Sequence, residues 1–343
     1  MEESPKEARI YTPGALVEEE DYEPSLRPSS LDEFVGQPAL REQLSVALEA
    51  ARARSEPLEH VLFAGPPGLG KTSLAQIVAR ELDVPFVQSA GPALERKGDI
   101  ASLLTAMEPG SVFFVDEIHR LNRAVEETFY PAMEDRRLPI TIGQGPGARV
   151  VTLELPPFTM VGATTRAGLL SNPLRDRFGL QYRLEVYEPS ELVRIVTRSA
   201  EILEISIEPT GAEVIASRSR GTPRVANRLL RRVRDWAEVR GSGSIDSESA
   251  NAALEMLQVD ALGLDRLDRE LLRVLCTDFA GRPVGLSTLA IAVGEEPDTI
   301  EEVYEPYLLQ SGLLARTQRG RIATAQAYAH LDVPVPGDRQ LFE

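Results

Sequence analysis

The feature that most constrains the fold is the stretch Gly65-Pro66-Pro67-Gly68-Leu69-Gly70-Lys71-Thr72, which fits the pattern G-x-x-x-x-G-K-[ST]. An apolar run over 60–64 precedes it and predicts a buried strand, and the periodicity over 73–80 predicts a helix. Glycines are needed because backbone N–H groups wrap a phosphate chain only where no side chain blocks the approach. The strand, the loop and the helix together predict a nucleotide-phosphate site rather than a chance glycine turn.

Each part of this phosphate loop has a predicted role. Lys71 is expected to reach the β- and γ-phosphates, and the hydroxyl of Thr72 to bind Mg²⁺. The helix that follows adds its N-terminal dipole to the anion site. Lys71 is one of three lysines in a chain that otherwise uses arginine, which favours a role for its compact charge. The predicted nucleotide-binding residues of the loop are Gly65, Pro67, Gly68, Gly70, Lys71, Thr72 and Ser73.

A second apolar run, over 111–115, ends in the carboxylates Asp116 and Glu117. This pattern is typical of a buried parallel strand that brings acids to the carboxyl edge of a sheet, where ligands bind in α/β proteins. Asp116 is expected to hold Mg²⁺ through water, and Glu117 to polarise the attacking water as general base. His119 is interpreted as a packing or hydrogen-bonding residue. A further strand ends at Thr164-Thr165, where a hydroxyl could sense the γ-phosphate.

Composition limits the class of protein. A chain of 343 residues with 43% hydrophobic residues is long enough for two or three soluble domains. The sequence predicts neither a signal peptide nor a membrane span, and its single Cys276 suits a reducing compartment, so we expect a cytoplasmic protein. Because the net charge is −16, any contact with DNA must be local.

The predicted elements divide the chain into three domains: an α/β domain over 1–187, a helical lid over 188–258 and a winged-helix domain over 259–343. In the first domain, two β-branched runs flank a glycine-rich turn and predict a protruding hairpin over 138–155. The hairpin either packs on the core or uses its apolar residues to bind a partner.

The last domain has the order helix, helix, helix and hairpin, which is a winged helix. The segment from Pro306 to Leu331 contains no acid, and Arg316, Arg319 and Arg321 fall on the wing. We expect these arginines to bind DNA. The alternative is a winged helix that binds another protein.

These features together resemble the AAA+ ATPases and, more narrowly, the RuvB family of motors that drive branch migration of Holliday junctions. The resemblance runs from about Leu26 to His330. It implies an AAA+ core with a parallel sheet, a helical lid and a winged helix. It also implies a homohexameric ring on duplex DNA that hydrolyses Mg-ATP between subunits. The implied partners are a RuvA-like junction-binding protein at the hairpin 138–155 and a RuvC-like resolvase.

The resemblance also assigns individual residues. Thr165 matches the first sensor of the γ-phosphate and Arg224 the second. Of Arg175 and Arg177, Arg177 matches the arginine finger that acts on the neighbouring subunit, although the residues alone leave that choice open. At Pro297 the chain departs from relatives that carry a basic residue, which puts a DNA contact there in doubt. The remaining nucleotide-binding residues implied by the resemblance are Leu26, Arg27, Glu134, Asp135, Arg136 and Tyr187.

Two other functions compete with the branch-migration motor. One is a clamp-loader-type AAA+ switch, and the other is a winged-helix regulator that uses ATP as a ligand. Glu117 argues against the regulator because a general base serves hydrolysis. The wing arginines argue against the clamp loader, whose last domain usually forms an oligomerisation collar.

Overall fold

The computed structural model describes residues 23–142 and 149–335. Residues 1–22, and the glycine-rich turn of the expected hairpin, lie outside these ranges. Contacts divide the chain into two compact units, one over 27–187 and the other formed by 1–26 with 188–343. Each unit is described by itself.

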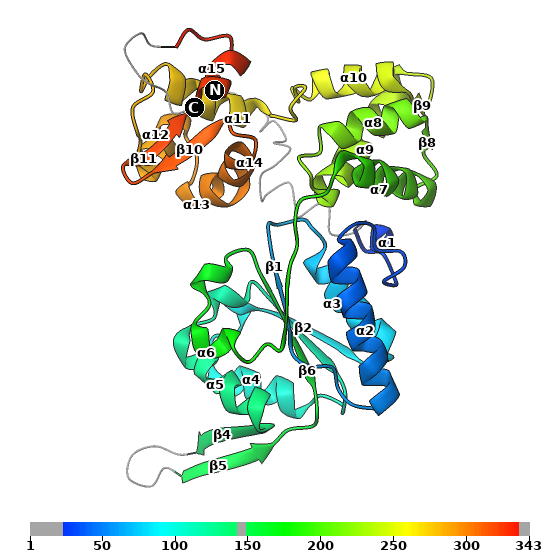
Figure 1. Cartoon of the computed structure of the whole chain (residues 1–343), viewed down its shortest axis with the longest axis vertical. Coiled ribbons are helices and arrows are strands. Elements are labelled where there is room, and N and C mark those ends of the chain that lie inside the picture. Colours follow the sequence, from blue (N-terminus) through cyan, green and yellow to red (C-terminus); the bar gives the residue numbers. More distant parts are fainter. Residues whose placement is uncertain (1–22, 143–148, 336–343) are drawn as a thin grey trace, which may run out of the picture. The chain divides into compact units, whose positions relative to one another are not determined.

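The first unit is built on a parallel sheet with the strand order β2-β3-β6-β1-β7 (Figure 1). Each neighbouring pair is parallel, which confirms the predicted α/β fold. The strands are β1 (Val61–Ala64), β2 (Phe86–Ala90), β3 (Val112–Asp116), β6 (Thr159–Thr164) and β7 (Leu180–Arg183).

Side chains on both faces of the central strands are buried. Phe113 and Val115 of β3 pack into the cluster formed with the helices α4 (Lys97–Thr105) and α5 (Arg123–Glu134), while Phe114 points to the opposite face and is also fully buried. Burial of such a side chain is worth about 1.5–3 kcal/mol. The continuous apolar run therefore predicts a central strand covered on both sides.

Helices cover the two faces of the sheet (Figure 1). The helix that follows the phosphate loop was predicted from the sequence, whereas α5 was not. The helices are α2 (Pro38–Arg54), α3 (Lys71–Leu82), α4 (Lys97–Thr105), α5 (Arg123–Glu134) and α6 (Asn172–Arg175), with short 3₁₀ turns at Gly91–Ala93, Ile118–Arg120 and Ala167–Leu169.

The expected hairpin is formed by β4 (Arg137–Ile142) and β5 (Arg149–Glu154), which pair in antiparallel register. Leu138 is fully buried at its base. Val151 pairs with Ile140 on the same face and is 40% exposed, and Val150 on the opposite face is 69% exposed. An apolar face therefore begins in the core and continues to the surface.

The second unit contains the short α1 (Glu23–Leu26) and the helical lid. The lid has four helices, as predicted, and a small parallel pair of strands. Its elements are α7 (Pro189–Ile202), β8 (Ser206–Ile207), α8 (Pro209–Ser217), α9 (Pro223–Arg240), β9 (Ser244–Ile245) and α10 (Ser247–Met256).

The same unit ends in the winged helix, which confirms the predicted fold of this region. The third helix contains a π-helical turn at Ile300–Tyr304 directly before Pro306, whose missing N–H prevents a regular α-helical bond. The elements are α11 (Arg266–Cys276), α12 (Leu286–Val293), α13 (Pro297–Thr299), α14 (Glu305–Gln310), β10 (Leu314–Thr317), β11 (Gly320–Ala323) and α15 (Ala325–His330). Across residues 23–142 and 149–335, no helix is both long and apolar enough to cross a membrane.

Candidate functional site

The ends of three neighbouring strands bring the predicted catalytic groups of the first unit together. In the sheet register Ala64 lies beside Thr164, and Val115 lies beside Gly162. The strands are parallel, so the residues after them share one edge of the sheet. The phosphate loop, the pair Asp116-Glu117 and Thr165 therefore emerge side by side, as the sequence predicted.

The phosphate loop has the backbone geometry that its glycines predict. Gly70 has φ 100°, and a Cβ there would lie 3.0 Å from the ring of Phe34. Gly65 has φ 150°, and its Cβ would lie 2.6 Å from the Leu184 carbonyl oxygen. Lys71 begins α3, is buried, and its Nζ donates to the carbonyl oxygens of Gly65 and Pro66 at 2.8 and 2.7 Å. The loop is thus wound around the lysine ammonium group.

Glu117 occupies a strained backbone position at the edge of the sheet. Its φ of 47° lies in the left-handed region, which costs a residue with a Cβ about 1–3 kcal/mol and is concentrated at functional sites. Its N–H donates to Oδ1 of Asp116 at 2.9 Å. Its carboxylate pairs with Nη1 of Arg120 at 3.0 Å, and both side chains are partly exposed. The general-base candidate is therefore accessible and held by a weak surface pair.

His119 has a structural role, as predicted from sequence. Its Nδ1 lies 3.0 Å from Oγ1 of Thr164, which is fully buried. Burial lowers the pKa of His119, so the neutral ring is favoured at neutral pH. Thr165 follows and is only half-buried. Of the two threonines, Thr165 is therefore the one whose hydroxyl a ligand can reach.

The residues proposed to hold Mg²⁺ fit that ion. Thr72 and Asp116 are both half-buried and supply oxygen donors, which Mg²⁺ prefers. Within the described ranges, no group of three His, Cys, Asp or Glu side chains could hold a metal on its own.

The other predicted nucleotide-binding residues are divided between the two units. Arg27 and Tyr187 belong to the first, where the buried Tyr187 donates its hydroxyl proton to the carbonyl of Leu69 in the phosphate loop at 3.1 Å. Leu26 and Arg224 belong to the second. The Leu26 carbonyl accepts a bond from Arg198 at 2.9 Å, and Arg224 lies in the first turn of α9.

Arg175 and Arg177 have different surroundings. The Nη2 of Arg175 donates to the carbonyl of Ala167 at 2.7 Å and points into its own loop. The guanidinium of Arg177 lies 4.3 Å from the ring centre of Tyr130, its Nη2 pairs with Glu134 at 3.0 Å, and its Nη1 donates to the carbonyl oxygen of Pro173. Glu134, Asp135 and Arg136 lie together at the exposed end of α5, beside Arg177. They therefore share a surface with Arg177.

The surroundings of the wing arginines differ from the expectation that no acid lies near them. Arg316 and Arg321 both pair with Glu305, at 3.0 and 2.9 Å, and Arg316 also pairs with Glu301. Both glutamates precede Pro306, so they lie outside the acid-free segment on which the expectation was based. Arg319 is exposed at the tip, and no ion pair joins it to a carboxylate among the described residues. The premise of three unpaired arginines was wrong.

Three family models match the chain in order. They are the "Holliday junction DNA helicase RuvB P-loop domain" over 26–184, the "RuvB AAA lid domain" over 187–260 and the "RuvB C-terminal winged helix domain" over 261–332. The chain belongs to the RuvB family.

Individual members of the RuvB family agree with this assignment. The "Holliday junction branch migration complex subunit RuvB" of Rubrobacter xylanophilus is 60% identical over 331 residues, which are 96% of this chain and 93% of that protein. The Parafrankia subunit of the same name is 57% identical over 330 residues, 96% and 94% of the two chains. The Thermotoga maritima RuvB "Holliday junction branch migration motor" matches with a TM-score of 0.83 and 51% identity, covering 91% of this chain and 100% of that one.

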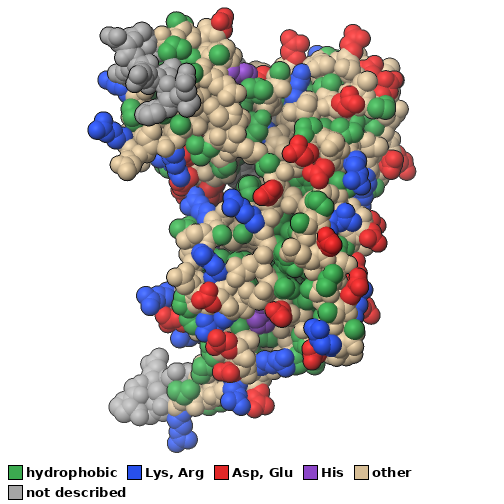
Figure 2. Space-filling model, in the orientation of Figure 1, with side chains coloured by type: hydrophobic (Ala, Val, Ile, Leu, Met, Phe, Trp, Pro, Cys, Tyr) green, Lys and Arg blue, Asp and Glu red, His purple; other side chains and the backbone are tan. Residues whose placement is uncertain are grey.

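The hairpin of this RuvB-family chain presents a mixed surface. Figure 2 shows hydrophobic and charged side chains over β4 and β5, next to residues that are not described. Val150 and Val151 are among the large hydrophobic side chains that the described surface exposes. Val151 continues the apolar face of β4 and β5, so this face of the hairpin is a candidate contact surface.

Sequence reasoning missed Tyr130, the ring on which Arg177 lies. The available signal was its spacing from Glu134, because residues four apart on a helix share a face. It also missed Arg120, the partner of Glu117 in the three-residue helical spacing. Sequence reasoning missed Tyr130 and Arg120 because neither of their segments was predicted to be helical.

The loop contacts of both arginines predict an effect on stability. Arg175→Ala and Arg177→Ala should each lower the free energy of unfolding of the first unit by about 2 kcal/mol, because each removes a charged donor from a loop carbonyl. Urea unfolding of both variants measures the two decreases. An unchanged free energy of unfolding for Arg177→Ala would show that its resting contacts contribute nothing to stability.

Proposed function

We propose that this protein is the ATP-driven motor of Holliday-junction branch migration, and that it acts in recombination and repair as a homohexameric ring on duplex DNA. One observation carries the proposal: a nucleotide site and a winged helix occur in a single chain that the three RuvB models match in order. The substrate is ATP with Mg²⁺. The cytoplasm is the proposed location.

In the proposed reaction, Lys71 and the N–H groups of the phosphate loop bind the β- and γ-phosphates. Glu117 takes a proton from the attacking water, and Thr165 donates to the γ-phosphate. The Glu117–Arg120 pair has to open first, and a pair this exposed is worth about 0.2–1 kcal/mol. Bound Mg²⁺ neutralises phosphate charge, and Thr72 and Asp116 would hold it.

The site is completed by residues outside this edge of the sheet. Leu26, Arg27 and Tyr187 line the adenine side, and Arg224 reaches the γ-phosphate from the lid. Arg177 acts as the finger on the neighbouring subunit's nucleotide, together with the surface formed by Glu134, Asp135 and Arg136. Because Arg224 and Arg177 both bind the γ-phosphate, hydrolysis changes the contacts of the lid and of the subunit interface.

Arg177 has to exchange its resting contacts for nucleotide. Its contact with Tyr130, its pair with Glu134 and its bond to the carbonyl of Pro173 are together worth about 2–5 kcal/mol. An arginine finger contributes about 10³–10⁵-fold to hydrolysis, or about 4–7 kcal/mol. The gain in the transition state therefore offsets the loss of the resting contacts, and the choice of Arg177 over Arg175 rests on the resemblance to the RuvB family.

DNA approaches from the tip of the wing. The third helix carries Glu301, Glu302 and Glu305, which repel phosphate and disfavour a recognition helix in the major groove. Arg319 is placed to bind a backbone phosphate, and Arg316, with a side chain 49% exposed, can follow by exchanging its carboxylate partners. Arg321 is only 11% exposed and is mainly structural. In a hexameric ring, six winged-helix domains bind the DNA at the same time, so weak individual contacts add up to a high overall affinity.

The partners follow from the family and from the hairpin surface. A RuvA-like protein would bind the apolar face of β4 and β5, and a RuvC-like resolvase would join a larger complex. A clamp loader or a winged-helix regulator fits less well, because neither accounts for a complete hydrolytic site together with an exposed basic wing tip.

Glu117→Gln tests the proposed reaction. The variant should bind ATP normally but hydrolyse it about 10²–10⁴-fold more slowly, because only the base is removed. With a synthetic four-way junction and a RuvA-like partner, wild type should migrate the junction and the variant should not. Glu108→Gln, an exposed carboxylate on another loop, is the matched control. Normal turnover by the Glu117 variant would refute the assignment.

Val151→Glu tests the partner surface. A charge on the face that Val151 shares with Ile140 should weaken binding of a RuvA-like protein at least about tenfold, since substitutions at the centre of an interface cost more than about 1–2 kcal/mol. ATP hydrolysis without the partner should be unchanged. Thr152→Glu, exposed on the opposite face of the strand, is the control. Similar affinity of both variants in calorimetric titration would mean that another surface binds the partner.

Arg319→Ala tests the wing tip. The slope of log K for duplex DNA against log salt should flatten by about 0.9 for each phosphate that the variant no longer binds. Arg273→Ala, an exposed arginine of α11, should leave the slope unchanged. Arg321→Ala should instead destabilise the domain by about 1.5–3 kcal/mol, because the buried Glu305 loses one of its two arginine partners and keeps only Arg316. A slope unaffected by Arg319→Ala would remove the wing tip from the DNA interface.

A further inference from the structure

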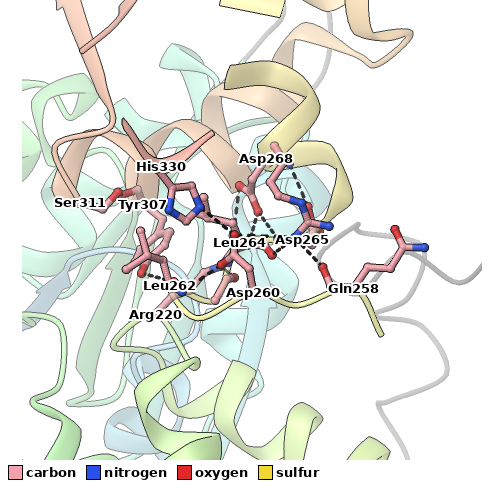
Figure 3. A network of polar contacts seen from close by, with 12 residues as sticks. Arg220, Gln258, Asp260, Leu262, Leu264, Asp265, Asp268, Tyr307, Ser311 and His330 are labelled. Carbon is pink, nitrogen blue, oxygen red and sulfur yellow. Dashed lines mark hydrogen bonds and ion pairs between the residues drawn. The ribbon is translucent and has the colours of Figure 1, made fainter. Parts of the chain in front are cut away.

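A buried ion pair joins the lid to the winged helix. Arg220 lies in the loop after α8, and its side chain is 4% exposed. Asp268 lies in the first turn of α11 and is fully buried. Nη1 of Arg220 lies 3.4 Å from one carboxylate oxygen of Asp268, and Nη2 bonds to the other (Figure 3). Both partners of this pair are therefore almost completely excluded from water.

Further contacts fix the guanidinium plane. Its Nε donates to the carbonyl of Gly263 at 2.7 Å, and its face lies 5.0 Å from the ring centre of Tyr307. The Tyr307 hydroxyl donates to the carbonyl of Leu262 at 2.6 Å. Figure 3 shows these groups converging from the lid, from the linker between α10 and α11, and from α14 of the winged-helix domain, called the head below. One side chain therefore touches three separate segments.

The linker also packs closely against the loop after α8, which carries Arg220. Gly263 has φ 75°, and a Cβ there would lie 2.4 Å from the carbonyl oxygen of Arg218. Nearby, Asp260 accepts the N–H of Leu264 at 2.9 Å and lies 2.8 Å from Nε2 of His330, in the last helix of the head. The connection between lid and head is thus tightly bonded, unlike a flexible linker.

In the sequence, Arg220 lies close to a residue that is proposed to bind nucleotide. Arg220 has φ 54° and is followed by Gly221 with φ 67°, a turn that leads into α9. Arg224, the residue proposed to reach the γ-phosphate, lies in the first turn of that helix. The first turn of α9, which carries Arg224, is therefore anchored to the winged helix through the nearby Arg220.

We propose that Arg220 is a positioning residue that locks the winged helix to the lid, so that both move as one body when nucleotide moves the lid. The proposal rests on the proposed motor function. A planar guanidinium bonded at several points fixes orientation as well as distance, which a lysine ammonium group cannot do. Without this lock, lid movement would be absorbed by the linker rather than passed to DNA.

The choice of variant follows from the chemistry of the pair. Burial raises the pKa of the Asp268 carboxyl, and the Arg220 guanidinium opposes that rise. After Arg220→Ala, Asp268 could simply take up a proton, and the effect would be hard to interpret. Arg220→Lys keeps the charge and removes the planar fork, so it isolates orientation. Asp268→Asn is the second variant, and the exposed Arg273→Lys is the matched control.

The test measures the distance between lid and head in the full-length ring. Spin labels are placed on Val239→Cys of α9 and Ile291→Cys of α12, which are 81% and 83% exposed. The native Cys276 can stay, because burial raises the pKa of its thiol to about 11 and keeps it unreactive. Pulsed electron resonance then reports the distance with ADP and with a non-hydrolysed ATP analogue.

Wild type and Arg273→Lys should give one narrow distance that is the same with both nucleotides. Arg220→Lys and Asp268→Asn should give a broad distribution, and junction migration per ATP hydrolysed should fall about tenfold while hydrolysis itself continues. A wild-type distance that changes with nucleotide would overturn the proposal, as would narrow distances and full coupling in both variants. Failure of wild type to migrate junctions would refute the proposed function alone, because the distances test the lock independently.

Discussion

The organisation of the first unit depends on the burial of both faces of its parallel strands. Polar groups in the middle of β1, β3 or β6 would reduce apolar burial, so the predicted catalytic groups lie at or just after the last residue of each strand. Because the strands are parallel and adjacent, these residues meet at one edge. The phosphate loop, the acids and the threonines are thus positioned by a hydrophobic constraint. The strained backbone of Glu117 is tolerated because β3 holds the residue before it and the residue after it, Ile118, is buried.

The groups assigned to the chemistry are held less firmly than the scaffold. Glu117 and Arg177 form partly exposed pairs that cost little to break, whereas Phe113, Phe114 and the other core side chains are fully excluded from water. This difference suits a cycle in which charged side chains exchange protein partners for phosphate. A rigid sheet keeps the reacting atoms in register while the weak pairs open.

The second unit uses buried charge for a different purpose. Arg220 with Asp268, and Arg321 with Glu305, are ion pairs in which at least one member is almost completely buried. Such pairs contribute little net stability compared with apolar residues of the same size, because desolvation offsets the attraction. They do impose a defined geometry. In a winged helix of an acidic chain, the result is a fixed wing whose arginines are largely satisfied internally, with Arg319 left exposed at the tip.

Local sequence patterns were enough to predict the phosphate loop, the acid-ended strand, the α/β class, the helical lid and the winged helix. Those features depend on glycine conformation and hydrophobic periodicity, which act between near neighbours. Which charges meet, in contrast, followed from the folded chain. Arg316 and Glu301 are 15 residues apart and Arg220 and Asp268 are 48 apart, so no local pattern links either pair. The same holds for Arg177 and Tyr130, whose contact distinguishes Arg177 from Arg175. Charge pairing depends on distance in space, and the fold alone sets that distance.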